Sequence, residues 1–270
     1  MSERKIFDCH HHAGEEADYA DRLAEECERI GTSKIVLLGF PEPRRPGANA
    51  LVLEAAERYP DLILPFAGVN MEHDTPEKIH AYKEQGFRGL KFIGPIRPYN
   101  HPAHLPLYHA AAEAGLVGLF HLGIVANSGN WRTADSNLMR PIYLDHIARQ
   151  IPDWKIIGAH LGNPWYEEAT MSCRWNPNLF FDLSGSTLKK KSPEFLGGLL
   201  WWSDETYYKS PDKTSAWQKI VFGSDVKAED MRDVVNDYER LCEALDLPEE
   251  RRRDIFYNTA ARIFDVPEEK

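Results

Sequence analysis

Short apolar runs alternate with longer segments of helical periodicity along almost the whole chain. Ile35 to Leu38 is a continuous apolar run of the kind found in buried parallel strands. Residues 15–30 instead place Leu23, Cys27 and Ile30 at helical spacing before Gly31, which is a helix-ending signal. This pattern predicts strands at 5–9, 34–38, 62–69, 87–93, 116–120, 154–159, 178–183 and 219–222, and helices at 15–30, 48–59, 75–85, 105–114, 138–150, 228–245 and 248–263.

Eight strands that alternate with helices favour a parallel barrel, so we predict an α/β fold of the (β/α)8 TIM-barrel type over residues 1–270 as one domain. An open doubly wound sheet is the alternative. We expect long loops after strands 4, 5 and 7, including residues 94–104 and 188–217. The aromatic-rich loop 188–217 is either a functional lid or an insertion that packs on the barrel or on a second subunit, which leaves a homo-oligomer open.

Composition narrows the range of partners. A net charge of −10 argues against nucleic acid, because phosphate binding requires a basic surface. No apolar run approaches the length of a membrane span of about 20 residues, and residues 1–5 lack the apolar core of a signal peptide. The four cysteines form no CxxC pair. We therefore expect a cytoplasmic protein with reduced thiols that acts on a small molecule.

Two histidines at the end of the first strand provide the first chemical signal. His10 and His12 are two residues apart, so a strand directs both imidazoles to the same side. Such a pair is half of a transition-metal site. The alternative is a flexible histidine tract, but Ile6 and Phe7 anchor the segment in the expected core.

Further polar residues occur at the ends of other predicted strands. In a parallel barrel the carboxyl ends of the strands meet at one mouth, where active sites are built. Three histidine-bearing strand ends and one aspartate-bearing strand end are an improbable coincidence. The residues at these positions in strands 4, 5, 6 and 8 are Lys91, His121, His160 and Asp225.

These motifs together resemble the amidohydrolase superfamily. The HxH pair on strand 1, the histidine on strand 5, the His-Leu-Gly at 160–162 and the Gly-Ser-Asp at 223–225 carry the resemblance. Residues 181–185 and 255–264 extend it over nearly the whole chain. More narrowly, the chain resembles the amidohydrolase-related branch of single-domain barrels, which includes hydrolases, lactonases and metal-dependent decarboxylases.

The resemblance implies that His10, His12, His121 and Asp225 hold one divalent metal ion, with His160 as the catalytic histidine. Asp225 would also take part in proton transfer. Three histidines and a carboxylate leave an open position for water, whose pKa such an ion lowers towards ~7. We expect Zn²⁺, with Mn²⁺ as the alternative.

The expected number of metal ions depends on whether Lys91 is a carbamylated metal ligand. In binuclear members of the superfamily a strand-4 lysine is carbamylated and bridges two metals. The Gly-Leu-Lys-Phe context of Lys91 resembles the single-metal branch, in which this lysine is not a ligand. Lys91 then contacts an anionic substrate or pairs with a buried carboxylate.

The expected activity is hydrolysis of a small, carboxylate-bearing lactone, amide or ester. The sequence Asn163-Pro164-Trp165 after His160 and the intact HxH pair resemble the hydrolases. Non-oxidative decarboxylation of an aromatic or unsaturated carboxylic acid is the alternative, and a non-catalytic metal-binding barrel is a third possibility. Basic and aromatic residues near the expected mouth are candidates for substrate binding, although each could instead form a surface salt bridge. These candidates are Lys91, Arg97, Trp131, Arg132, Arg140 and Trp165.

Overall fold

The computed structural model describes residues 5–126, 133–203 and 210–269, and it confirms the predicted TIM barrel. Eight strands form one sheet in chain order, and all seven neighbouring pairs are parallel. Each predicted strand is present, although several are shorter than expected. Their bounds are β1 (Ile6–His12), β2 (Thr32–Leu38), β3 (Ile63–Gly68), β4 (Gly89–Phe92), β5 (Val117–Phe120), β6 (Ile156–Gly158), β7 (Leu179–Asp182) and β8 (Ile220–Val221).

Backbone hydrogen bonds join the first strand to the chain just beyond the last one. The amide of Cys9 donates to the carbonyl of Phe222 at 2.9 Å, and the amide of Asp225 donates to the carbonyl of His10 at 2.7 Å. These bonds close the sheet and hold β1 beside the segment that follows β8.

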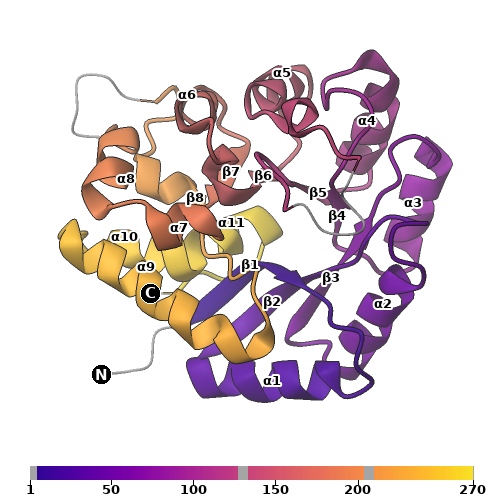
Figure 1. Cartoon of the computed structure of the whole chain (residues 1–270), viewed down its shortest axis with the longest axis horizontal. Helices are drawn as coiled ribbons and strands as arrows, with labels where there is room; N and C mark the ends of the chain where they lie inside the picture. The colour runs from indigo at the N-terminus through magenta and orange to yellow at the C-terminus, as the bar shows by residue number, and fades with distance from the viewer. Residues whose placement is uncertain (1–4, 127–132, 204–209, 270) are drawn as a thin grey trace.

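Helices surround the strands (Figure 1). Helix α3 begins as the sequence predicts, with Pro76 in the first turn and Thr75 accepting a hydrogen bond from the amide of Lys78. Helix α1 ends at Gly31, whose φ of 82° lies in the left-handed region. The helices are α1 (Tyr19–Ile30), α2 (Ala48–Arg58), α3 (Pro76–Glu84), α4 (Leu105–Glu113), α5 (Ile142–Gln150), α6 (Tyr166–Trp175), α7 (Ser186–Lys190), α8 (Pro193–Leu199), α9 (Met231–Ala244), α10 (Glu249–Arg253) and α11 (Thr259–Phe264).

Three of these helices were not predicted. Helix α6 buries Tyr166, Ala169, Thr170 and Cys173, which follow the i, i+3, i+4, i+7 pattern of an amphipathic helix. Helices α7 and α8 occupy part of the expected loop after strand 7, so that connection is partly helical. None of the described helices has the length and apolar character needed to cross a bilayer.

The core has two parts. The barrel interior is filled by side chains that alternate along the strands, and Phe264 of α11 closes one end by stacking on Phe7, with ring centroids 5.1 Å apart. The layer between strands and helices contains an aromatic cluster in which the ring of Trp154 stacks on that of Tyr108 at 5.4 Å. The indole nitrogen of Trp154 donates to the carbonyl of Leu116 at 2.7 Å.

Trp154→Ala removes a side chain that is 2% exposed together with its hydrogen bond. We expect the free energy of unfolding to fall by about 3–5 kcal/mol, because a large cavity forms in a packed layer. Chemical denaturation measures the change. The matched control is Trp175→Ala, which removes a side chain that is 46% exposed and should cost no more than about 1 kcal/mol. Equal losses in the two variants would contradict the proposed role of the aromatic cluster.

Candidate functional site

Asp225 lies at the centre of a cluster of histidines at the carboxyl ends of the strands. Its Oδ1 is 3.6 Å from Nε2 of His10 and 3.7 Å from Nε2 of His12. Its Oδ2 is 3.6 Å from Nε2 of His160. Ligand-type atoms of His10, His160 and Asp225 all lie within 4.8 Å of one another, which makes them a candidate group for holding a metal ion.

His121 follows β5 and lies on the same side as the cluster. Its ring centroid is 5.0 Å from that of His160. Nε2 of His121 and Nδ1 of His12 are buried, and neither atom has a hydrogen-bond partner among the described residues. Ligand atoms bound to one tetrahedral zinc lie about 3.3 Å apart, so the separations of 3.6 and 3.7 Å between Asp225 and the Nε2 atoms of His10 and His12 need only small adjustments. The donor set therefore fits a divalent metal ion.

The backbone is left-handed at two of the strand ends. His160 and Leu161 have φ values of 61° and 46°, and Asp225 has a φ of 46°. Residues other than glycine rarely adopt these backbone angles, and such strain is typical of functional sites. Hydrogen bonds hold the strained segment: the amide of His160 donates to Asp182, and the hydroxyl of Thr187 donates to the carbonyl of His160 at 2.6 Å.

Burial controls the charges of the cluster. It lowers the pKa of His12 and His121 well below the usual value of histidine and also lowers the pKa of His160, which favours the neutral imidazole in all three. A neutral imidazole has the lone pair that a metal requires. Burial also lowers the pKa of Lys91 to about 8, although Asp225 and Asp182 act in the opposite direction. The amine of Lys91 is 3.2 Å from Nε2 of His10.

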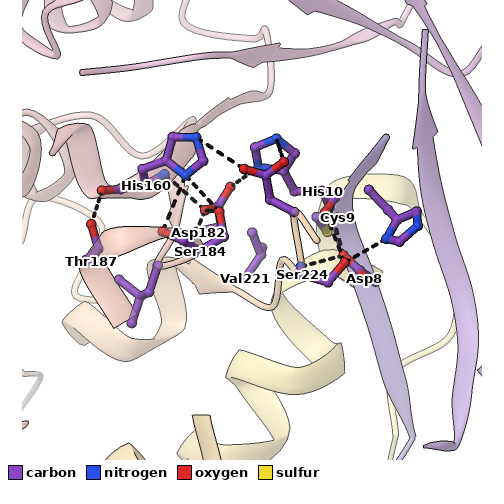
Figure 2. Close-up of polar contacts among 12 residues, drawn as sticks. Asp8, Cys9, His10, His160, Asp182, Ser184, Thr187, Val221 and Ser224 are labelled. Carbon is purple, nitrogen blue, oxygen red and sulfur yellow. Dashed lines mark hydrogen bonds and ion pairs between the residues drawn. The ribbon is translucent and has the colours of Figure 1, made fainter. Parts of the chain in front are cut away.

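Asp182, at the end of β7, is a site residue that we did not predict as such. Figure 2 shows it between His10 and His160. Its Oδ2 is 2.9 Å from Nδ1 of His10, and its Oδ1 accepts from the amide of His160 and from Ser184. Burial alone would raise the pKa of Asp182, but His10 and these hydrogen bonds hold it below its usual range. Its strand-end position, shared with His121 and His160, was the available signal.

A second buried carboxylate joins β1 to the segment after β8. Oδ1 of Asp8 accepts from the amide of His10 at 2.9 Å and from the amide of Ser224 at 3.0 Å. Burial raises the pKa of Asp8 to about 7. His11 points away from the cluster, as expected for the opposite strand face, and contacts Ser224 and Tyr19 of α1.

Comparison with known families identifies this arrangement. A family profile described as amidohydrolase matches residues 7–266. The chain belongs to the amidohydrolase family. This result confirms the resemblance predicted from the HxH pair, the strand-end histidines and the Gly-Ser-Asp motif. It is consistent with both the expected hydrolase and the alternative decarboxylase.

Solved structures share the barrel of this amidohydrolase over nearly its full length. An uncharacterised TIM-barrel protein from Bordetella bronchiseptica has a TM-score of 0.74 and 16% identity, with 97% of this chain and 98% of that chain covered. A probable 2-pyrone-4,6-dicarboxylic acid hydrolase from Acinetobacter baumannii, with citric acid bound, has a TM-score of 0.64 and 14% identity, with 97% and 99% covered. A 5-carboxyvanillate decarboxylase from Novosphingobium aromaticivorans, complexed with manganese, has a TM-score of 0.63 and 14% identity, with 91% and 80% covered.

These similarities establish the fold only, because the identities are low. No curated protein gave a significant sequence match.

The predicted substrate-binding residues of the amidohydrolase lie in different environments. Lys91 is fully buried beside the histidines. Arg97 instead forms an ion pair with Glu72. Arg140 pairs with Glu168, and its guanidinium lies 5.2 Å from the centre of the Trp165 ring. Trp131 and Arg132 lie outside the described residues.

One pocket borders the cluster at the barrel mouth. It has a volume of about 520 Å³ and is lined by residues that include His12, Asp225 and Lys227. It is large enough to accept part of a small molecule next to His12 and Asp225. A second pocket, of about 480 Å³, is formed by the loops after β2, β3 and β4 and includes Arg44 and Arg97, but no residue of the cluster lines it.

Gly223→Ala tests how tightly the strand ends are packed. A Cβ at this position would lie 3.0 Å from the Cβ atoms of both His10 and Asp182, which are buried on strands. We expect a loss of about 1–3 kcal/mol of stability, because neither neighbour can move freely. Thermal and chemical denaturation measure it. Gly198→Ala in α8, where an added Cβ would meet no described atom of another segment within 4 Å, is the control and should stabilise the protein by about 0.4–1 kcal/mol. A neutral Gly223→Ala variant would show that the two strand ends have room to separate.

Proposed function

We propose that this amidohydrolase is a metal-dependent hydrolase of a small, carboxylate-bearing lactone, amide or ester. The observation that carries the proposal is the position of the Asp225 carboxylate, which lies 3.6–3.7 Å from the Nε2 atoms of three histidines. A largely buried cluster of imidazoles around one carboxylate is poorly explained by stability alone. One domain, a cytoplasmic location and a homo-oligomer stay predictions from the sequence.

In this proposal His10, His12, His121 and Asp225 hold one divalent ion. Nitrogen and oxygen donors in this ratio suit Zn²⁺, and Mn²⁺ is the alternative supported by the manganese-bound structural neighbour. When bound, such an ion lowers the pKa of a water molecule and polarises a carbonyl group.

His160 acts as the general base and acid at its Nε2 atom. The atom faces the carboxylate of Asp225, and burial lowers the pKa of His160, so its proton-free form is available near neutral pH. Asp225 orients the imidazole and stabilises the positive charge that His160 acquires when it takes a proton. His160 then returns the proton to the leaving group.

Lys91 recognises the carboxylate of the substrate. Its side chain is fully buried, and its amine lies 3.2 Å from Nε2 of His10. No carboxylate within the described part of the chain bonds directly to Lys91, and a buried cation in this situation is stabilised by an anionic ligand. We assign Arg97 and Arg140 weaker roles at the rim, because Glu72 and Glu168 already pair with them. Trp165, and also Trp131 and Arg132 by sequence position, complete the proposed substrate-binding set.

Non-oxidative decarboxylation is the second candidate. The structural neighbours that carry it out share the same barrel. Lys91 would then position an aromatic carboxylate while His160 supplies a proton to the ring carbon. The products separate the two activities, because hydrolysis consumes water without release of CO₂.

Metal analysis of protein purified without chelator should give about one equivalent of divalent ion per chain. Asp225→Ala and His10→Ala should reduce this content, because each removes a proposed ligand. Elemental analysis with the two variants in parallel is the measurement. Two equivalents together with a carbamate on Lys91 would show that the single-metal assignment is wrong.

His160→Asn should retain the metal ion while kcat falls by about 10²-fold or more, because the amide cannot transfer the proton. Activity on lactone, amide and aromatic carboxylate panels is measured alongside metal content. Loss of the metal in this variant would make His160 a ligand and contradict its assignment as the proton carrier.

Lys91→Met keeps the length of the side chain and removes its charge. We expect KM for a carboxylate substrate to rise by about 10-fold or more, with little change for its neutral ester analogue. The control is Lys219→Met, a second buried lysine, which bonds to the carbonyls of Asn176 and Pro177. It should affect stability alone. An equal rise in KM for acid and ester would remove the case for carboxylate recognition by Lys91.

A further inference from the structure

The buried Asp182 carboxylate faces two sets of donors. Oδ1 accepts from the amide of His160 at 3.0 Å, the amide of Ser184 at 2.9 Å and the hydroxyl of Ser184 at 2.6 Å. Among the described residues, Oδ2 has one partner, Nδ1 of His10, at 2.9 Å (Figure 2). Asp182 and Ser184 are both fully buried, so water does not compete for these atoms.

The hydrogen bonds of His10 place its proton on Nδ1. An ionised carboxylate can only accept, so Nδ1 of His10 must donate to Asp182. On the other side of the ring, the amine of Lys91 lies 3.2 Å from Nε2. A charged amine can only donate, so Nε2 must carry the lone pair. Two independent contacts therefore require the same tautomer.

The same reasoning applies to His160 through Ser184. The single hydroxyl proton of Ser184 is donated to Asp182, so the Ser184 oxygen must accept from Nδ1 of His160 at 2.9 Å. The carbonyl of Ser184, 3.3 Å from the same nitrogen, can also only accept. Nε2 of His160 therefore presents its lone pair towards Asp225.

We propose that Asp182 and Ser184 are positioning residues that fix the Nδ1–H tautomer of His10 and His160, so that both Nε2 lone pairs point into the site. Asp182 acts on His10 directly and on His160 through Ser184. The roles of the two lone pairs, in metal binding and in proton transfer, rest on the function proposed above. The tautomers themselves follow from the hydrogen bonds and can be tested without a metal or a substrate.

Asp182→Asn and Ser184→Ala should have different effects. Three donors face the Oδ1 position and one faces the Oδ2 position, so an asparagine amide should turn its oxygen towards the three donors. Its NH₂ group then faces Nδ1 of His10 and moves the His10 proton to Nε2. Ser184→Ala leaves His10 unchanged and removes the hydroxyl that accepts from His160.

The first measurement is the ¹H–¹⁵N correlation spectrum of histidine side chains in the metal-free protein at pH about 7.5, which lies above the usual pKa of histidine and below the pKa of about 8 of Lys91. Both His10 and His160 should carry the proton on Nδ1 in the unmodified chain. Asp182→Asn should move the proton of His10 alone to Nε2. An Nε2–H tautomer for either histidine in the unmodified chain would overturn the inference.

The second measurement separates metal affinity from turnover. Competition with a chelator should show about 10–100-fold weaker Zn²⁺ binding for Asp182→Asn and less than a twofold change for Ser184→Ala. Ser184→Ala should instead lower kcat by about tenfold with metal content retained. Equal metal affinity in Asp182→Asn and the unmodified protein would also overturn the inference.

Control variants distinguish positioning from a general loss of stability. Asp254→Asn changes another buried carboxylate, which bonds to Arg251 and Arg262, and Ser172→Ala changes another buried serine. Neither should alter the histidine spectra or Zn²⁺ affinity. If Asp182→Asn does not fold, the spectrum of the unmodified chain still tests the proposed tautomers, and the kcat of Ser184→Ala still tests the role of Ser184. Absence of any hydrolytic activity, with the expected tautomers present, would refute the proposed function while leaving this inference intact.

Discussion

The junction between the first strand and the chain beyond the last strand is the constraint on which the site depends. Asp8 accepts hydrogen bonds from the amides of His10 and Ser224, and the amide of Asp225 donates to the carbonyl of His10. Residues more than two hundred positions apart in the sequence are thereby held side by side. Without this closure the Asp225 carboxylate would have no fixed relation to His10 and His12.

The site is an arrangement of buried charges around neutral imidazoles. Asp182 supplies a negative charge behind the histidines, and Lys91 supplies a positive charge beside them. Burying either group alone would be costly, because a low-dielectric interior disfavours isolated charge. Hydrogen bonds from His10, His160 and Ser184 offset that cost for Asp182. The polar groups therefore stabilise one another and define a single arrangement of the site.

The barrel and most of its mouth could be predicted because buried parallel strands are continuous apolar runs and because every strand end faces the same opening. The ends of the elements were less predictable: β8 spans only Ile220–Val221, since the closing contacts are made by the irregular residues that follow. Helix α6 was missed although Tyr166, Ala169 and Cys173 have helical spacing. All eight strands were thus predicted, whereas three of the helices between them were not.

Contacts between residues that are far apart in the sequence could not be predicted either. Glu168 lies 28 positions after Arg140, and nothing in the sequence links the two residues. Asp182 was visible at a strand end, but its two bonded histidines belong to β1 and to the turn after β6. Such roles depend on which atoms meet in three dimensions.

Different strands contribute the reactive cluster and the pocket of about 480 Å³ at the barrel mouth. The cluster around Asp225 is drawn from β1 and from the strands after β4, whereas the pocket of about 480 Å³ is built from the loops after β2, β3 and β4. None of the residues that line this pocket is a site histidine or Asp182. Substitutions confined to the pocket lining could therefore change specificity while the reactive groups stay in place. Exchange of whole loops would also disturb Phe40, which stacks on His12, and Tyr99, which donates to the carbonyl of His121.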